Sequence, residues 1–469
     1  MINILVNELK GFLRNKLFIF LSLFFLIALC VVTFFGIIQN KKQVEAQKIA
    51  KEHIRLQWDE MEPSNPHSAA HFGTYAFKST SILNSIDEGI NSVTGNVLRL
   101  EGHKQNDVAF SEASQSLLIS KFGKLKPALI FQFIIPLFLI FFSFNSYTSE
   151  RSNGRLKLLL IQGVSLKQIV FAKAFSIWII GVVLLLASVL VQLLFNSTQL
   201  SADTLLRLTL LLSVYAVYFF IIVNLTVLLS VVFKNSTSAL SLTILIWVIW
   251  TIFLPSTIGK TAEEIFPLPT RIDLKESMAE DRSKGINGHN PREDRRQALE
   301  KATLEKYKVE KLQDLPINFS GILMQEDEEY GNKVWDKHFG SLYNQLKAQK
   351  YIYQIFGVVN PFISLQNLSM GMSGTDMHHH LSFLNQAEKY RRVFIKSLND
   401  EYAFGGSKTG ERGWKASNEF FRSVKEFQYQ NPTFRSFYSK YAIDFFILLF
   451  WFFILLILLS FSSRKTLDI

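Results

Sequence analysis

The sequence predicts an all-α membrane protein with six transmembrane helices. Hydrophobic residues make up 49% of the 469 residues, Phe alone occurs 43 times, and the mean hydropathy is positive at +0.19. This composition is typical of membrane proteins rather than of ordinary soluble domains. Crossing the hydrocarbon core takes about 20 predominantly apolar residues. Six segments meet this requirement: Leu17–Ile38, Leu125–Phe144, Phe175–Phe195, Leu206–Phe233, Ala239–Ile258 and Tyr441–Phe461.

The distribution of charge predicts that the N- and C-termini are both cytoplasmic. Lys and Arg near the ends of spans mark the cytoplasmic side of a membrane protein. With the N-terminus inside, the short inside segments hold most of the net charge of +11, and the long loops 39–124 and 259–440 are close to balanced. A few lysines at outer span ends depart from this trend, but long loops are translocated largely regardless of charge. The basic excess therefore indicates contact with anionic membrane lipid and no nucleic acid.

Residues 1–38 are expected to hold an N-terminal interfacial helix and the first span. From Ile2 to Arg14, apolar and polar residues alternate at helical spacing. This pattern predicts an amphipathic helix that lies on the inner leaflet, and a plain extension of the first span is the alternative. Cys30 is the only cysteine and lies inside the span, so the chain has no internal disulfide.

Residues 39–124 and 259–440 are predicted to form two mainly helical extracytoplasmic domains. The first starts as a helical continuation of the first span to Trp58, and the second is long enough to be a domain in its own right. Helical patterns in the second occur at Pro291–Leu312, Ile322–Tyr353 and Met377–Phe404. Between the last two, Ile355–Met370 is apolar but broken by Gly and Pro. We predict that it is buried or interfacial and does not span the membrane.

Residues 125–258 contain spans two to five, and residues 441–469 the last span with a short cytoplasmic tail. The strongest functional candidate is the segment 148–173, between the second and third spans. It holds a short basic amphipathic helix bounded by Gly154 and Gly163. Such a helix can seat an apolar face in a groove on a partner protein. An ordinary basic loop that merely follows the charge rule is the alternative.

This segment resembles the coupling helix of type-2 ABC exporter permeases. In that family, a Glu-Arg pair, a glycine, a leucine run, a second glycine, a small residue and a later lysine precede the third span. The matching residues are Glu150, Arg151, Gly154, Leu156, Leu158, Leu159, Gly163, Ser165 and Lys173. The sequence departs from the family at Gly163-Val164-Ser165, where many members have a proline.

The resemblance implies a function for the whole chain. It would be the permease subunit of an ATP-driven ABC exporter in the bacterial inner (cytoplasmic) membrane. It would not be an enzyme and would hold no cofactor, because ATP and Mg would be bound by a cytoplasmic ABC ATPase dimer that contacts the nine residues. Six spans are half of the usual set, so the resemblance implies a second permease subunit, identical or paralogous. The mostly apolar spans favour an amphiphilic, lipid-like or peptide substrate.

A second resemblance covers part of the loop before the last span. The residues that carry it are Asn360-Pro361-Phe362, Ser369-Met370, Gly374-Thr375-Asp376, His378-His379, Phe383, Ala387-Glu388 and Tyr390-Arg391. They are similar to a pattern in a bacterial branch of these permeases. That branch has a large extracytoplasmic domain of unassigned function between its last two spans.

A metal site is not expected near this pattern. Met370, Met372, Met377 and His378–His380 offer ligand types that bind copper or zinc. However, three consecutive histidines on a helix point in different directions and cannot all face one ion. We therefore predict that one or two of these histidines act as helix-cap or interface residues after Asp376.

Ionisable residues are scarce in the predicted spans. Arg207 and Asp444 lie near the outer ends of the fourth and last spans, and Gln132, Gln192 and Asn224 are the main amides at depth. This scarcity argues against a proton-coupled carrier and an intramembrane protease. Neither a nucleotide-binding glycine loop nor a His-Glu-x-x-His motif is present, so the sequence shows no ATPase domain of its own, and the ATPase that the resemblance implies would be a separate subunit.

Two other functions stay open. In the first, a partner ATPase drives the spans, and these transmit force to a periplasmic partner without transport through the membrane domain. In the second, the chain is a membrane receptor or scaffold without a link to ATP, and the segment 148–173 is dispensable. A polar or amphipathic substrate path would favour transport, whereas a closed, tightly packed interface would favour force transmission.

Overall fold

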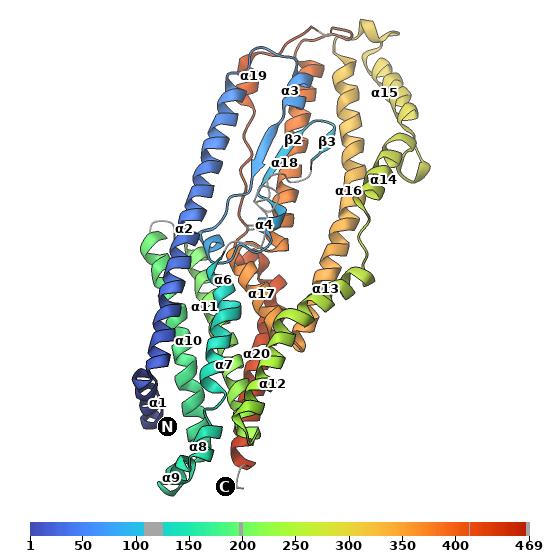
Figure 1. Cartoon of the computed structure of the whole chain (residues 1–469). Coiled ribbons are helices and arrows are strands. Elements are labelled where there is room, and N and C mark those ends of the chain that lie inside the picture. Colours follow the sequence, from blue (N-terminus) through green and yellow to red (C-terminus); the bar gives the residue numbers. More distant parts are fainter. Residues whose placement is uncertain (107–124, 197–199, 412, 466–469) are drawn as a thin grey trace.

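The computed structural model describes residues 1–106, 125–196, 200–411 and 413–465. The ends of two predicted regions, residues 107–124 and 466–469, therefore lie outside the described residues. The chain is mostly helical, and its long helices run roughly along one axis of an elongated molecule (Figure 1). Both termini lie at one end, together with α1, α8 and α9, and the segments between the first and second and between the fifth and last spans form the other end.

Six helices of the described residues are long and apolar enough to cross a membrane, which confirms the predicted number and order of spans. Four of them are single helices: α2 (Lys16–Asp59) is the first span, α10 (Leu166–Asn196) the third, α11 (Ala202–Val232) the fourth and α20 (Phe434–Lys465) the last. The second span consists of α6 (Pro127–Leu129), η3 (Ile130–Ile134), α7 (Ile135–Ser143) and α8 (Thr148–Ser152). The fifth consists of α12 (Ser236–Val248), η5 (Ile249–Phe253) and α13 (Leu254–Ile265).

Each of the two spans that contain proline has a turn of π-helix just before the proline. One turn of π-helix, η3, precedes Pro136, and another, η5, precedes Pro255. Proline has no backbone N–H and its ring collides with the preceding helical turn, so a regular α-helix cannot pass through it unchanged. A wider turn absorbs this conflict, and in both spans the helix continues through the proline.

The centre of the bundle is α11. In its most apolar window 72% of the residues are buried, against 22% in α2. Helix α11 packs most extensively against α20 and α10, and also against α17 (Pro361–Ser373) and α7. The first helix, α1 (Ile2–Arg14), matches the predicted range, and Asn15 separates it from α2 by capping the N–H groups of Leu17 and Phe18.

We call the part of the molecule beyond the spans, away from the termini, the distal body. Its elements between the first two spans are the outer part of α2, α3 (Pro66–Phe72), β1 (Thr74–Phe77), η1 (Ile82–Ser85), α4 (Asn91–Thr94), β2 (Val97–Glu101) and β3 (Lys104–Gln105). Those before the last span are α14 (Arg271–Lys284), η6 (Ile286–Gly288), α15 (Arg292–Tyr307), η7 (Leu312–Asp314), α16 (Phe319–Ile355), η8 (Phe356–Val358), α17 (Pro361–Ser373), α18 (Met377–Phe404) and α19 (Asn418–Ser423).

The two segments of the distal body pack around shared apolar clusters, although the sequence suggests two separate domains. Trp58 and Ala70 from the first segment pack with Phe394 and Phe421 from the second. A small antiparallel sheet has the strand order β1-β2-β3, and apolar residues of β1 and β2 pack against α18. The described residues of both segments therefore form one body. The sheet was not predicted, because its strands are only two to five residues long.

The apolar helix α17 is buried at the junction between the spans and the distal body. Almost all of its residues are buried, including Phe362, Leu365 and Leu368. It packs against the outer parts of α11 and α20 (Figure 1). Helix α17 is not among the six candidate spans. This agrees with the prediction that Ile355–Met370 is buried or interfacial and not a span: its part in α17 is buried, whereas Ile355, Phe356, Val358 and Val359 are exposed.

Candidate functional site

The candidate coupling segment forms the tip of the molecule at the end that carries both termini. Helices α8 and α9 (Arg155–Ile161) extend beyond the neighbouring spans (Figure 1). We call residues 148–165 the basal tip. Gly154 joins the two helices in the left-handed region, with φ 70°, and Gly163 ends the turn after α9 with φ 80°. Both positions favour glycine, because a side chain is strained at such φ values.

The apolar residues of α9 are divided between the interior and the surface. Leu156 is fully buried in the core of the spans, so it fastens the helix and is not free to contact a partner. Leu158 and Ile161 are 62% and 82% exposed. Arg155 and Lys157 are exposed beside them. The surface is therefore an apolar spot with basic neighbours, as the sequence predicts, but Ile161, which the sequence pattern did not single out, is its most exposed apolar residue.

A buried lysine ties the basal tip to α1 and α10. Lys173 is 3% exposed, and its Nζ lies 2.7 Å from Oε1 of Glu8 and 3.2 Å from Oε1 of Glu150. Two carboxylates around one ammonium satisfy its charge where water is scarce. This cluster joins the N-terminal helix, the end of the second span and the start of the third.

Further bonds join α8 to the end of α11. Arg151 donates from Nη2 to the carbonyl oxygen of Phe233 at 2.6 Å. The backbone N–H groups of Tyr147 and Thr148 donate to Oγ of Ser230. A carbonyl at a helix C-terminus is left without an intrahelical partner and attracts a cation. The Glu-Arg pair thus anchors the tip through two different neighbours.

The third span starts with a capping box. Oγ of Ser165 accepts the N–H of Gln168, and Oε1 of Gln168 accepts the N–H of Ser165. This reciprocal pair satisfies two of the free donors at a helix start. Ser165 thus positions the beginning of α10 directly after Gly163.

The predicted interface residues therefore fall into three groups. The exposed ones are Gly154, Leu158, Gly163 and Ser165, and Glu150, Arg151 and Leu159 are half-buried. Leu156 and Lys173 are buried and act within the chain.

The ionisable residues at the outer span ends are held by the distal body. Arg207 donates to Asp203 at 2.6 Å and to the carbonyl oxygens of Gly371 and Pro432. Asp444 accepts from Gln354 at 2.6 Å and from Asn367 at 3.2 Å. These contacts give both charges a structural role in fixing α16 and α17 to the spans.

A buried chain of polar groups crosses the same junction. Gln132 in the second span donates to the hydroxyl of Tyr215 at 3.1 Å, and that hydroxyl lies 2.7 Å from Oγ of Ser369. Ser369 in turn donates to Asp87. Burial raises the pKa of Asp87, although its hydrogen bonds with Ser369 and Gly89 oppose this shift. Four elements distant in sequence thus meet at this point.

One of the consecutive histidines at the start of α18, His379, takes part in the helix cap, in agreement with the expectation that one or two of them are cap or interface residues. Asp376 is its N-cap and accepts from the N–H and Nδ1 of His379. Burial acts to raise the pKa of Asp376, but the hydrogen bond and charge of His379 outweigh it and hold the pKa below its usual range. Burial lowers the pKa of His378 and of His380 to about 4. Both imidazoles are therefore neutral at pH 7.

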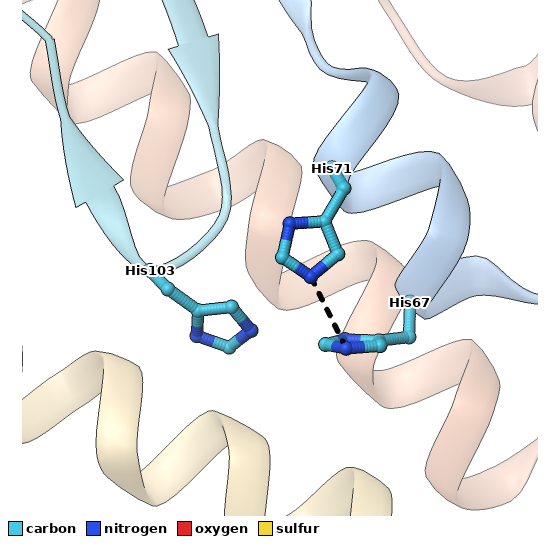
Figure 2. Close-up of side chains that lie close together, drawn as sticks. All are labelled: His67, His71 and His103. Atoms are coloured by element: carbon cyan, nitrogen blue, oxygen red, sulfur yellow. Dashed lines mark hydrogen bonds between the residues drawn. The ribbon is translucent and has the colours of Figure 1, made fainter.

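A different set of histidines, which the sequence analysis overlooked, comes together in the distal body. His67 and His71 lie on α3, and His103 lies in the turn between β2 and β3 (Figure 2). Their ligand atoms all lie within 4.8 Å of one another. The spacing of four residues between His67 and His71 was a usable sequence signal, because it places two side chains on one face of a helix.

Two parts of the chain are similar to families of proteins without an assigned function. The family described as "Domain of unknown function (DUF3526)" matches residues 271–430, which cover most of the distal body before the last span. The family described as "Protein of unknown function (DUF2705)" matches residues 103–284, which include the basal tip and spans two to five. No curated protein matches the chain.

Proposed function

We propose that the chain is the permease subunit of an ATP-driven ABC transporter, an exporter, and that α9 docks on a separate cytoplasmic ATPase. One observation carries the proposal. Leu158 and Ile161 form an exposed apolar spot on α9, a short helix held by its buried Leu156 and joined to α8, which in turn contacts α10 and α11 through Glu150 and Arg151. A lipid-facing span also exposes apolar residues, but α9 is flanked by exposed Arg155 and Lys157, which favour an aqueous or headgroup setting.

The contacts that hold the basal tip explain how movement of a partner would be transmitted to the spans. When the ATPase subunits close on ATP, they push α9, and Lys173 and Arg151 carry this displacement to α10, α1 and α11. A second permease subunit, identical or paralogous, completes the membrane part. The apolar spans favour a lipid-like or peptide substrate that is amphiphilic. ATP and Mg are bound by the partner in this proposal.

The direct test is capture of an ATPase by tagged protein from bacterial membranes in detergent. Ile161→Asp places a charge in the apolar spot and is expected to abolish capture. Ile272→Asp is the matched control, because Ile272 is also exposed, at 69%, but lies on α14 in the distal body. Mass spectrometry and ATPase activity identify the partner. Capture of the same ATPase by both variants and by the native chain would exclude this docking surface.

Force transmission to a periplasmic partner is the second candidate, and the shape of α2 favours it. This helix runs without a break from the bundle to the distal body over 44 residues. Such a rod, with the polar contacts of Arg207 and Asp444, is suited to move the distal body together with the spans. The two functions differ in what stimulates the ATPase of the assembled complex in nanodiscs. Amphiphilic compounds should stimulate a transporter, whereas only a soluble partner of the distal body should stimulate a force transmitter.

A further inference from the structure

Three imidazoles converge on one point at the surface of the distal body. Asn65 caps α3 and Pro66 begins it, and the helix then presents His67 and His71 on one face. His103 reaches the same point from the β2–β3 turn, where its backbone has φ 62° (Figure 2). A non-glycine residue in the left-handed region is uncommon and is held there by its surroundings. The sheet register therefore directs His103 toward α3.

The spacing of the nitrogens suits a tetrahedral metal ion. Nε2 of His67 and Nε2 of His71 are 3.2 Å apart. Two nitrogens bound to one Zn²⁺ at about 2.0–2.1 Å in tetrahedral geometry are about 3.4 Å apart. The third ring lies at centroid distances of 5.3 and 5.4 Å from the other two. Small side-chain rotations bring all three nitrogens to ligand distance.

A buried carboxylate independently points to the same chemistry. Nδ1 of His103 lies 3.0 Å from Oε1 of Glu328, and Glu328 also accepts the backbone N–H of His103. With Nδ1–H donating to the carboxylate, Nε2 of His103 carries the free lone pair that faces His67 and His71. Metal-bound histidines commonly have such a carboxylate partner, which fixes the tautomer and the ring orientation. Arg391 holds Glu328 from its other oxygen at 3.0 Å.

We propose that His67, His71 and His103 bind a divalent transition-metal ion, with Zn²⁺ as the best match. Imidazole suits zinc, and three protein ligands leave the fourth position open for water or an anion. Arg99 and Arg282 donate to the backbone carbonyl oxygens of His71 and His103 and so help to fix the backbone that carries two of the three ligands. Because His71 is exposed, the ion can enter directly from solvent. The inference does not depend on the proposed transport function.

The experiment uses the full chain in detergent micelles, purified with a tag that contains no histidine and treated with a chelator that is then removed. Titration with Zn²⁺ is followed by calorimetry, and Co²⁺ serves as a spectroscopic probe. We expect one Zn²⁺ per chain and the visible absorption of four- or five-coordinate Co²⁺. Both signals should disappear in His71→Phe, which keeps an aromatic ring in place but removes the ligand nitrogens.

His53→Ala is the matched control, because His53 is an exposed histidine on α2 outside the cluster. It should bind one Zn²⁺ with unchanged affinity. Zn²⁺ should also raise the unfolding temperature of the native chain and of His53→Ala, but not that of His71→Phe. Equal binding by the native chain and His71→Phe would overturn the proposal, as would a native chain without stoichiometric binding. The latter result would mean that the three rings only pack against one another.

Discussion

The basal tip and the distal body differ in which residues they expose and which they bury. At the basal tip, apolar Leu158 and Ile161 are exposed, and one buried lysine fastens the tip to its surroundings. The distal body, in contrast, contains a buried ion pair: Arg391 is 1% exposed and Glu328 3%. An exposed apolar spot has little effect on the stability of its own chain, whereas a buried ion pair is costly to disrupt.

This contrast separates binding from stability. Substitutions of the exposed apolar side chains of the basal tip should change the affinity for a partner and leave unfolding unchanged. Substitutions inside the distal body should change unfolding and leave the partner bound. Each prediction below tests one side of this separation, and the largest expected effect comes first.

Arg391→Met should destabilise the distal body by about 3–5 kcal/mol, because it leaves the buried carboxylate of Glu328 without its arginine and removes one of the two arginines that pair with Glu388. Arg392→Met is the matched control on the same helix. Arg392 pairs with Glu388 and with exposed Asp336, and its side chain is 30% exposed, so its loss should cost about 1 kcal/mol or less. Thermal unfolding followed by tryptophan fluorescence measures both variants. Equal shifts in the two would show that burial does not set the strength of these pairs.

The sequence predicted the parts of this fold that depend on local patterns. The six spans follow from hydropathy alone, and the range of α18 follows from helical spacing and the cap at Asp376. The Gly and Pro residues that interrupt the apolar segment before α18 predict that it is not a span, and α17 is not among the six candidate spans. In each case the deciding information lies within one turn or one helix.

Contacts between distant residues were not predictable in the same way. His103 and Glu328 meet across 225 positions in the chain, and Trp58 packs with Phe421 across 363. The leucine run of α9 also shows this limit. Its periodicity indicates an amphipathic helix, but not that Leu156 is buried while Ile161 is exposed. That division depends on the neighbouring spans against which the helix packs.

Lys78 should give the distal body a measurable dependence on alkaline pH. Burial lowers the pKa of Lys78 to about 8, against 10.5 for the free side chain, and the charge of Asp376 only partly offsets this. The folded state thus disfavours the charged lysine. The penalty is complete below about pH 8 and is relieved as the pH rises to 10.5, which corresponds to about 3 kcal/mol of added stability.

The comparison of the native chain with Lys78→Met isolates this effect from other titrating groups. Lys78 also donates to Asn91 at 2.6 Å, so the variant's stability at pH 7 reflects two opposing changes. The pH dependence is the cleaner measurement. Between pH 8 and 10.5, the unfolding temperature of the native chain should rise relative to that of Lys78→Met. A constant difference in unfolding temperature between the two proteins over this range would mean that folding does not lower the pKa of Lys78.

Lys173→Met should loosen the basal tip without affecting the distal body. The substitution leaves Glu8 and Glu150 facing each other without the ammonium between them. Loss of these charge-assisted hydrogen bonds costs about 2 kcal/mol, or roughly a 30-fold faster local opening. Hydrogen exchange measured by mass spectrometry should therefore accelerate in α1, α8 and α9, and remain unchanged in α18. Uniform acceleration along the chain would indicate that the cluster supports the whole fold rather than the tip.

The smallest predicted effect compares two glycines with open space around them. Gly154 has φ 70° and Gly259 lies inside α13, and a Cβ at either position would meet no atom within 4 Å. Alanine at Gly154 must adopt the left-handed region, which costs about 1 kcal/mol, whereas alanine at Gly259 should stabilise its helix by up to about 1 kcal/mol. Neither change removes a contact, so any effect on ATPase binding comes from the conformation of the tip.

If the tip is held ready for a partner, Gly154→Ala should weaken ATPase binding about fivefold, which corresponds to about 1 kcal/mol. Gly154→Asn should restore much of this affinity, because asparagine tolerates the left-handed region better than alanine. Gly259→Ala should bind as the native chain does. Unchanged affinity in Gly154→Ala would mean that the partner shapes the tip on binding, and that the exposed residues alone, not their fixed geometry, carry the contact.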